Sequence, residues 1–122
     1  MPIAPNRFKR ALAKGEKQLG LWSGLGSPLV AEIIAHAGFD WIVIDTEHAP
    51  NEPRDVLSHL QAMATGTATP VTRAPWNDMV LLKRILDVGS ASVLIPFVQN
   101  AVEARRAVAA PGYPPRGVRA VA

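Results

Sequence analysis

The densest group of chemically reactive side chains in this sequence follows a run of apolar residues. Residues 39–45, Phe-Asp-Trp-Ile-Val-Ile-Asp, lead directly into Thr46, Glu47 and His48. His48 is the best candidate for a general base, because an imidazole titrates near neutral pH and here has carboxylates beside it. Asp45 and Glu47 are placed to orient the imidazole or to hold water around a metal. The alternative interpretation is a surface loop with ordinary charged residues.

Two further candidates also end apolar runs. Arg73 closes residues 70–73, where a guanidinium suits a bound carboxylate because its planar fork donates two parallel hydrogen bonds. The alternative for Arg73 is a structural ion pair. Trp22 is a candidate for the wall of a substrate pocket shared with Asp45 and Glu47, although a buried tryptophan more often belongs to a core.

The remaining histidines and the lysines are weaker candidates. His36 falls in the last turn of a predicted helix, where the helix dipole favours a cation, and His59 is predicted to be exposed in mid-helix. The lysines precede the first predicted strand or, at position 83, lie in mid-helix. Covalent catalysis through a Schiff base needs an amine inside the pocket, so a metal-assisted reaction fits this chain better.

Short apolar runs alternate with helical patterns along the chain. The runs are continuous, which predicts strands covered on both faces; they are residues 19–22, 39–45, 70–73 and 92–98. After a first helix at 6–14, four helices are predicted from their capping residues: Ser27 to Gly38, Asn51 or Glu52 to Gly66, Asn77 or Asp78 to Gly89, and Asn100 to Pro111. Asn100 and Glu103 resemble a capping box.

Four βα units at a spacing of roughly 25 residues predict an α/β fold with a parallel sheet and right-handed crossovers. An open doubly wound sheet and part of a barrel both fit this order, and no Gly-rich phosphate loop follows a strand. A complete (β/α)₈ barrel needs ~250 residues. The 122 residues therefore predict one partial domain, the N-terminal half of a TIM barrel truncated at its C-terminus.

Composition places the chain among globular proteins, with 48% hydrophobic and 19% charged residues. There is no cysteine, and no apolar stretch approaches the ~20 residues that span a bilayer. We therefore expect a cytoplasmic protein with no membrane partner. The formal net charge is +3, but no aromatic residues alternate with a basic stripe, so no nucleic-acid partner is expected.

These candidates lie in stretches that resemble the metal-dependent pyruvate aldolases of the HpcH/HpaI (4-hydroxy-2-oxoheptanedioate aldolase) family. The block Asp-x-Glu-His-Ala-Pro at residues 45–50 is specific, although Thr46 occupies a position that is often Gly in the family. The matching stretches are residues 20–25, 37–51, 70–73, 76–78, 83–89, 94–100 and 113–119.

The resemblance implies a homo-oligomeric (β/α)₈ barrel, a hexamer, that uses Mg²⁺, Mn²⁺ or Co²⁺. By match to the family motif, His48 is the base, Arg73 binds the substrate carboxylate, and Asp87 is the acid that raises the basicity of His48. Asp87 ends a predicted helix, however, and a simple barrel places that point at the face opposite His48. The family's direct metal ligands follow its fifth and sixth strands, the latter in a Gly-Pro-Ala-Asp stretch, and neither stretch occurs in this sequence.

The activity implied by the resemblance is reversible cleavage of a 4-hydroxy-2-oxo diacid, a small-molecule 2-oxo acid, to pyruvate and an aldehyde such as succinic semialdehyde. Alternatives within the superfamily are a 2-dehydro-3-deoxy sugar-acid aldolase and a citrate-lyase-like subunit. An alternative from another class is a non-catalytic truncated remnant.

Overall fold

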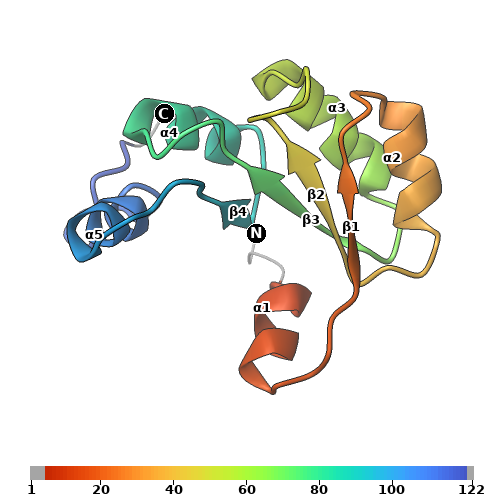
Figure 1. The fold of residues 1–122 in the computed structure, drawn as a ribbon, viewed down its shortest axis with the longest axis horizontal. Coiled ribbons are helices and arrows are strands. Elements are labelled where there is room, and N and C mark those ends of the chain that lie inside the picture. The colour runs from red at the N-terminus through yellow and green to blue at the C-terminus, as the bar shows by residue number, and fades with distance from the viewer. Residues whose placement is uncertain (1–4, 121–122) are drawn as a thin grey trace.

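The computed structural model describes residues 5–120 and shows strands alternating with helices along the chain (Figure 1). In chain order the elements are α1 (Arg7–Ala13), β1 (Gly20–Ser23), α2 (Pro28–Ala35), β2 (Trp41–Asp45), α3 (Pro53–Met63), β3 (Thr69–Arg73), α4 (Met79–Asp87), β4 (Val93–Leu94) and α5 (Ala101–Ala109). The predicted order of strands and helices is confirmed. None of the helices in this part of the chain has the length and apolar character that crossing a membrane requires.

The four strands form one parallel sheet in the order β1-β2-β3-β4. A doubly wound sheet reverses its strand order at a switch point, whereas this sheet adds each new strand beside the preceding one. Sequential addition with a helix between neighbouring strands is the topology of a barrel. The prediction of about four βα units of a (β/α) barrel is therefore confirmed.

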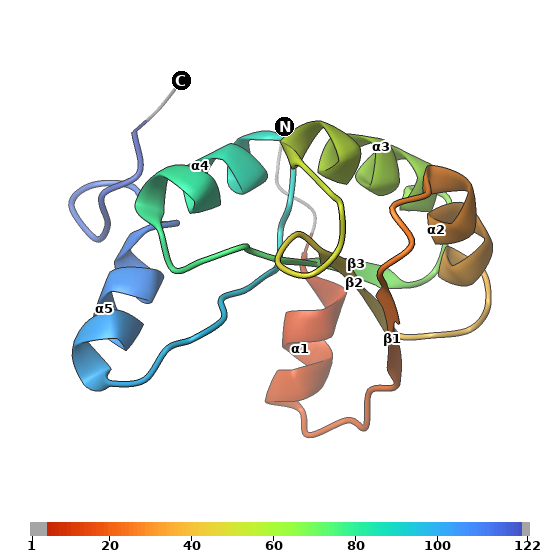
Figure 2. The same ribbon diagram turned by 45° about the horizontal axis from the view of Figure 1, so that its top comes forward.

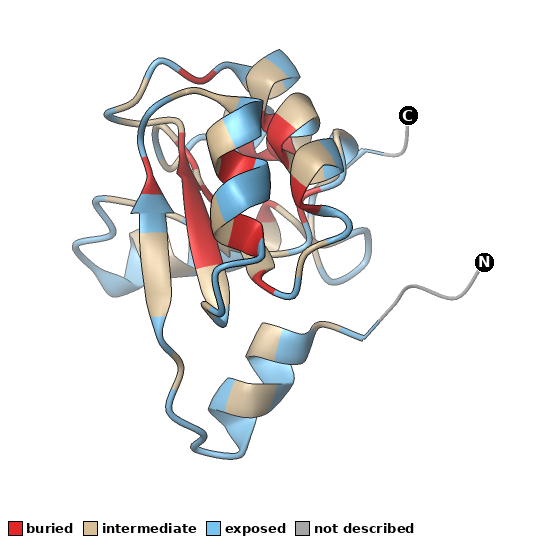
Figure 3. Ribbon diagram, turned by 90° about the vertical axis from the view of Figure 1, so that its right-hand side faces the viewer, coloured by how far each residue is buried: buried red, intermediate tan, exposed pale blue. Residues whose placement is uncertain are grey.

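Helices α2, α3 and α4 lie on one side of the sheet and α1 on the other (Figure 2). The main core forms where α2 and α3 cover β2, and Figure 3 shows the buried residues gathered there. Ile42 and Ile44 point into this core, because alternate residues of a strand face the same side. Val43 and Asp45 consequently share the opposite face, which is the interior face of a barrel.

Helix α1 is held against that interior side of the sheet. The Phe8 and Trp41 rings lie 6.1 Å apart between centroids. Asn6 caps α1 through its side-chain oxygen and donates from its amide nitrogen to the Ser92 hydroxyl at 2.7 Å. The cap of the first helix thus also ties it to the segment that precedes β4.

The edges of the sheet differ from the expected pattern. Residues 42 to 45 of β2 are all buried, but Trp22 of β1 is 47% exposed and Leu94 of β4 is 41% exposed. The prediction of strands covered on both faces is therefore wrong for β1 and β4, because Trp22 and Leu94 lie on the interior face of the sheet, which residues 5–120 leave open to solvent at these two positions. The predicted strand at 92–98 also shortens to two residues. Arg73, the last residue of β3, pairs with Leu94, and Phe97 has a φ of +59° that no extended strand allows.

Most helix starts follow the predicted caps. Ser27 caps α2 and Asp78 caps α4. For α3 the cap is Glu52, which forms a capping box with Asp55. Asn100 accepts from two backbone N–H groups of α5, but Glu103 accepts from the backbone N–H of Gln99 rather than of Asn100. The predicted capping box is therefore incomplete, because Glu103 bonds the backbone N–H one residue before the cap.

The exposed position predicted for His59 is wrong. The residue is 0% exposed and shares a helix face with Val56 and Met63. Its Nδ1 lies 2.7 Å from the backbone oxygen of Asp55 one turn earlier, which gives the buried ring a polar partner.

Candidate active site

The sheet register brings the sequence candidates together at the carboxyl ends of the strands. Asp45 of β2 pairs directly with Arg73 of β3. Trp22 of β1 pairs with Val43, two residues before Asp45 and on the same face. Three neighbouring strands therefore present Trp22, Asp45 and Arg73 to one side, at the edge where parallel α/β folds place their reactive residues.

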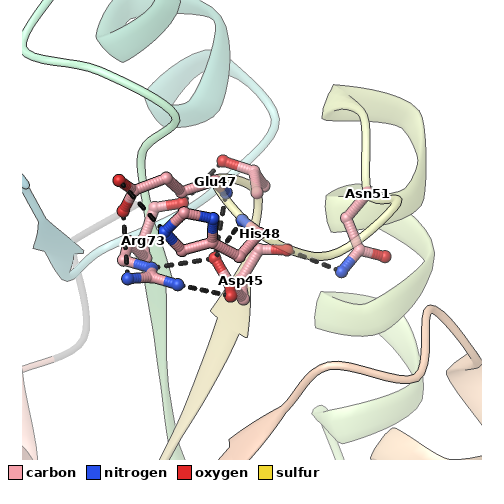
Figure 4. A network of polar contacts seen from close by, with 6 residues as sticks. Asp45, Glu47, His48, Asn51 and Arg73 are labelled. Carbon is pink, nitrogen blue, oxygen red and sulfur yellow. Dashed lines mark hydrogen bonds and ion pairs between the residues drawn. The ribbon is translucent and has the colours of Figure 1, made fainter.

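Arg73 and Asp45 form a two-pronged ion pair (Figure 4). Arg73 Nε donates to Asp45 Oδ1 at 2.8 Å, and Nη2 donates to Oδ2 at 2.6 Å. The side chains are only 17% and 9% exposed, respectively, so solvent screens the pair little. The structural ion pair considered for Arg73 is thus present, and it uses one edge of the guanidinium.

The pair shifts both ionisation equilibria. Burial alone raises the pKa of Asp45, but hydrogen bonds from Arg73 and from the backbone N–H groups of Glu47 and His48 bring it below its ordinary value. The hydrogen bond with Asp45 raises the pKa of Arg73. Asp45 is therefore an anion at neutral pH, and it fixes both the guanidinium and the loop that follows β2.

Glu47 lies between Arg73 and His48. Its Oε2 is 3.0 Å from Arg73 Nη1, and its Oε1 is 3.5 Å from His48 Nε2. The Glu47 side chain is 14% exposed, whereas that of His48 is 73% exposed. A carboxylate next to the imidazole supports the predicted orienting role, and the exposed ring is free to meet a proton donor in a substrate.

Trp22 packs on the guanidinium of Arg73, and its role as a pocket wall stays a prediction. Arg73 Cζ lies 4.6 Å from the centroid of the Trp22 ring. An aromatic face attracts a cation at this distance. Trp22 therefore covers one face of Arg73 and restricts approach to the plane of the guanidinium.

Two residues that were not recognised as site residues shape the loop between β2 and α3. Asn51 is 5% exposed and donates from Nδ2 to the backbone oxygen of Asp45 at 2.7 Å. Thr46 donates from its hydroxyl to the backbone oxygen of Arg73 at 2.6 Å. The sequence marks Asn51 only as a candidate helix cap, and the departure from Gly at position 46 is the signal it offers for Thr46.

Asp87 lies apart from these residues in the fold. It ends α4, which runs back from the carboxyl edge of the sheet, and its Oδ1 accepts from Arg119 Nη2 at 2.6 Å. Arg119 also stacks on Tyr113, with Cζ 5.1 Å from the ring centroid. Within residues 5–120 the carboxylate beside His48 is Glu47, so the assignment of Asp87 as the acid acting on His48 stays a prediction.

The described residues do not by themselves make a metal site. Residues 5–120 contain no group of three or more His, Asp or Glu side chains arranged to hold a metal ion. Both carboxylate oxygens of Asp45 already accept hydrogen bonds from Arg73, and Oδ1 also accepts two from the backbone. This donor set is built to hold a guanidinium and a loop, not a hard cation.

Comparison with known proteins matches residues 18–122 to the family described as HpcH/HpaI aldolase/citrate lyase. The chain belongs to this family. The resemblance identified from residues 45–50 and the other matching stretches is thereby confirmed.

Individual relatives agree in sequence and in fold. The 4-hydroxy-2-oxo-heptane-1,7-dioate aldolase of Salmonella dublin is 56% identical over 116 residues, which are 95% of this chain and 44% of that protein. The crystal structure of a HpcH/HpaI aldolase/citrate lyase family protein from Burkholderia cenocepacia J2315 matches with a TM-score of 0.93 at 42% identity, over 97% of this chain and 49% of that one. The HpcH/HpaI aldolase of Desulfitobacterium hafniense DCB-2 matches with a TM-score of 0.83 at 31% identity, over 93% and 44%. The chain thus spans about half the length of these relatives.

Proposed function

We propose that this chain supplies the His48 and Arg73 part of an active site that cleaves a 4-hydroxy-2-oxo acid to pyruvate and an aldehyde. The observation that carries the proposal is an exposed imidazole linked through Glu47 to a guanidinium that Asp45 fixes at the carboxyl edge of the sheet. The 56% identity to an aldolase of 4-hydroxy-2-oxo-heptane-1,7-dioate supports the same substrate class.

In this proposal Arg73 binds the carboxylate of the substrate and His48 accepts the proton of the C4 hydroxyl. Removal of that proton allows the C4 oxygen to form the aldehyde carbonyl while the C3–C4 bond breaks. The bonding electrons move to C3 and onto the 2-oxo group as the enolate of pyruvate. Protonation of the enolate at C3 completes pyruvate. In this proposal His48, which has accepted the proton of the C4 hydroxyl, is the proton donor. Asp45 holds Arg73 in position throughout.

A divalent cation, Mg²⁺, Mn²⁺ or Co²⁺, belongs to the proposal because aldolases of this family generally depend on one. When bound, such an ion supplies positive charge that stabilises an enolate. We assign its direct ligands to residues outside 5–120, since the carboxylates described here are occupied by Arg73 and the backbone. Assembly as a homo-oligomer, a hexamer as the family resemblance implies, is part of the same proposal.

The experiment is a substrate panel on a chimera in which residues 1–122 replace the matching N-terminal part of the Salmonella dublin aldolase. Pyruvate release is measured with 4-hydroxy-2-oxoheptanedioate, with a 2-dehydro-3-deoxy sugar acid and with citramalate. We expect the heptanedioate to give the highest kcat/KM. Preference for the sugar acid would move the assignment to a sugar-acid aldolase, and release from citramalate alone would favour a lyase of the citrate-lyase type.

A further inference from the structure

A hollow of about 270 Å³ lies between the segments that follow β3 and β4. Its lining comes from the segment between β3 and α4, from the segment between β4 and α5, and from α5 itself; the residues are Trp76, Asn77, Phe97, Gln99, Glu103 and Arg106. Asn77 Nδ2 donates to the backbone oxygen of Glu103 at 3.2 Å, which ties the two walls together. Neither Arg73 nor His48 lines the hollow, so it is separate from the candidate active site.

Trp76 and Phe97 form a stacked aromatic pair in this lining. Their ring centroids lie 5.2 Å apart, and the ring planes differ by 29°. Trp76 is 51% exposed and Phe97 is 62% exposed. The pair therefore keeps aromatic surface open to solvent, on which a further planar ring can stack favourably in an offset arrangement.

The backbone of Phe97 adopts a conformation that the packing of its own side chain does not explain. Its φ is +59°, in the left-handed region that bulky residues rarely adopt because Cβ approaches a carbonyl oxygen. Such a conformation persists where packing enforces it or where a functional site uses it. Because the Phe97 ring is mostly exposed, packing in a core does not enforce it here. The unusual backbone therefore points to a functional use of the ring in the hollow.

Arg106 gives the hollow a positive charge that a ligand can use. Within residues 5–120 no carboxylate lies within ion-pairing distance of its guanidinium. Glu103, the carboxylate in the lining, accepts from the backbone N–H of Gln99 at 2.7 Å. It also lies in the first turn of α5, where the helix dipole favours an anion. The planar fork of Arg106 is thus open to the carboxylate of a ligand.

We propose that this hollow binds a small aromatic carboxylate. The ring of the ligand stacks on the pair formed by Trp76 and Phe97, and its carboxylate pairs with Arg106. The volume is just below the roughly 300–1,000 Å³ of pockets for drug-sized ligands, which suits a molecule with one ring. The inference does not rest on the proposed function, because none of the residues assigned to that reaction lines the hollow.

The test titrates the ¹⁵N-labelled 122-residue chain with benzoate and follows the indole N–H signals of its three tryptophans. We expect the Trp76 signal to shift with a dissociation constant on the order of 1 mM. The Trp22 signal reports on ligands at Arg73, 4.6 Å away, and should stay unchanged. Cyclohexanecarboxylate has the same charge but no aromatic face, so it should bind about two- to tenfold more weakly.

Two variants separate the charge from the ring. Arg106→Gln should weaken benzoate binding about two- to fivefold, as expected for loss of an exposed ion pair. Arg105→Gln makes the same change of net charge at the neighbouring exposed position, outside the lining, and should leave binding unchanged. Phe97→Asn removes the ring, and asparagine tolerates a left-handed backbone. This variant should therefore bind benzoate more weakly without a lower free energy of unfolding.

Equal affinity for benzoate and cyclohexanecarboxylate would overturn the proposal, as would equal weakening by Arg106→Gln and Arg105→Gln. A shift of the Trp22 signal alone would place the ligand at Arg73 and overturn it too. A lower free energy of unfolding for Phe97→Asn would make the aromatic pair part of the packing of the fold rather than a binding surface. Calorimetric titration of the chimera should give the same affinity for benzoate, whereas no binding would mean that other parts of the barrel or a partner subunit cover the hollow.

Discussion

Replacing Arg73 by methionine tests whether the Asp45 pair holds the carboxyl edge of the sheet together. The change leaves the Asp45 side chain, 9% exposed, without its counter-charge. Loss of one partner from a buried pair costs about 3–5 kcal/mol. The two hydrogen bonds to a charged group, at about 1.5–3 kcal/mol each, give the same range. Asp45 keeps two backbone N–H donors, and methionine can still pack on Trp22. We therefore expect the free energy of unfolding to fall by about 3 kcal/mol, the lower end of this range.

The assay is equilibrium unfolding in urea at one fixed protein concentration, followed by tryptophan fluorescence. Arg54→Met, at an exposed position of α3, is the matched control and should change the free energy of unfolding by no more than about 0.5 kcal/mol. The folded-state pKa of Asp45 is lower than its ordinary value of 3.8. Its contribution to stability is therefore complete above that value and is lost as pH falls through the lower folded-state pKa. The difference in the free energy of unfolding between wild type and Arg73→Met should therefore become smaller as the pH falls through the same range.

A loss below about 1 kcal/mol at pH 7 would refute this reasoning, since exposed pairs contribute no more than that. A difference that stays constant down to pH 2 would show that Arg73 stabilises the fold through packing rather than through the Asp45 charge.

Three further predictions follow from the same contacts. Asn51→Ala leaves the Asp45 carbonyl without its buried donor and should lower the free energy of unfolding by about 1–3 kcal/mol; an unchanged urea midpoint would contradict the role given to Asn51. Arg73→Lys in the chimera keeps the charge but loses the fork, so kcat/KM for pyruvate release should fall at least about tenfold; kinetics equal to wild type would make Arg73 purely structural. The isolated 122-residue chain should sediment as a species larger than its 13.1 kDa monomer, because β1 and β4 each leave one edge unpaired within residues 5–120; a single monomer at all concentrations would contradict this.

Much of the fold was predictable from local pattern. The continuous apolar run ending in Asp45 and the caps Ser27 and Asp78 depend on residues close in sequence, and all three appear as expected. The length of β4 was not predictable in this way. It depends on where β3 ends and on the positive φ of Phe97, and neither is visible in the apolar composition of residues 92–98.

The candidate site also has one part that the sequence predicts and another part that it does not. The residue types at Asp45, Glu47, His48 and Arg73 indicated a reactive edge, and their positions at strand ends predicted that they would meet. The sequence alone does not tell which side chain Arg73 pairs with. The register of β2 against β3 places Arg73 opposite Asp45, and this register is a tertiary property. Burial of His59 was likewise unpredictable from its polar type, since the face that α3 turns to the core is a tertiary property.

The most direct test of the central claim is pyruvate release by the chimera with His48 intact and with His48→Ala, beside the 122-residue chain alone, each with Mn²⁺. The account predicts turnover of 4-hydroxy-2-oxoheptanedioate by the intact chimera and a loss of about 10²–10⁴-fold on His48→Ala, the usual contribution of a general base. It predicts no turnover by the chain alone, because the described residues hold no metal-binding cluster. Near-normal turnover by the His48→Ala chimera, or measurable turnover by the chain alone, would contradict it.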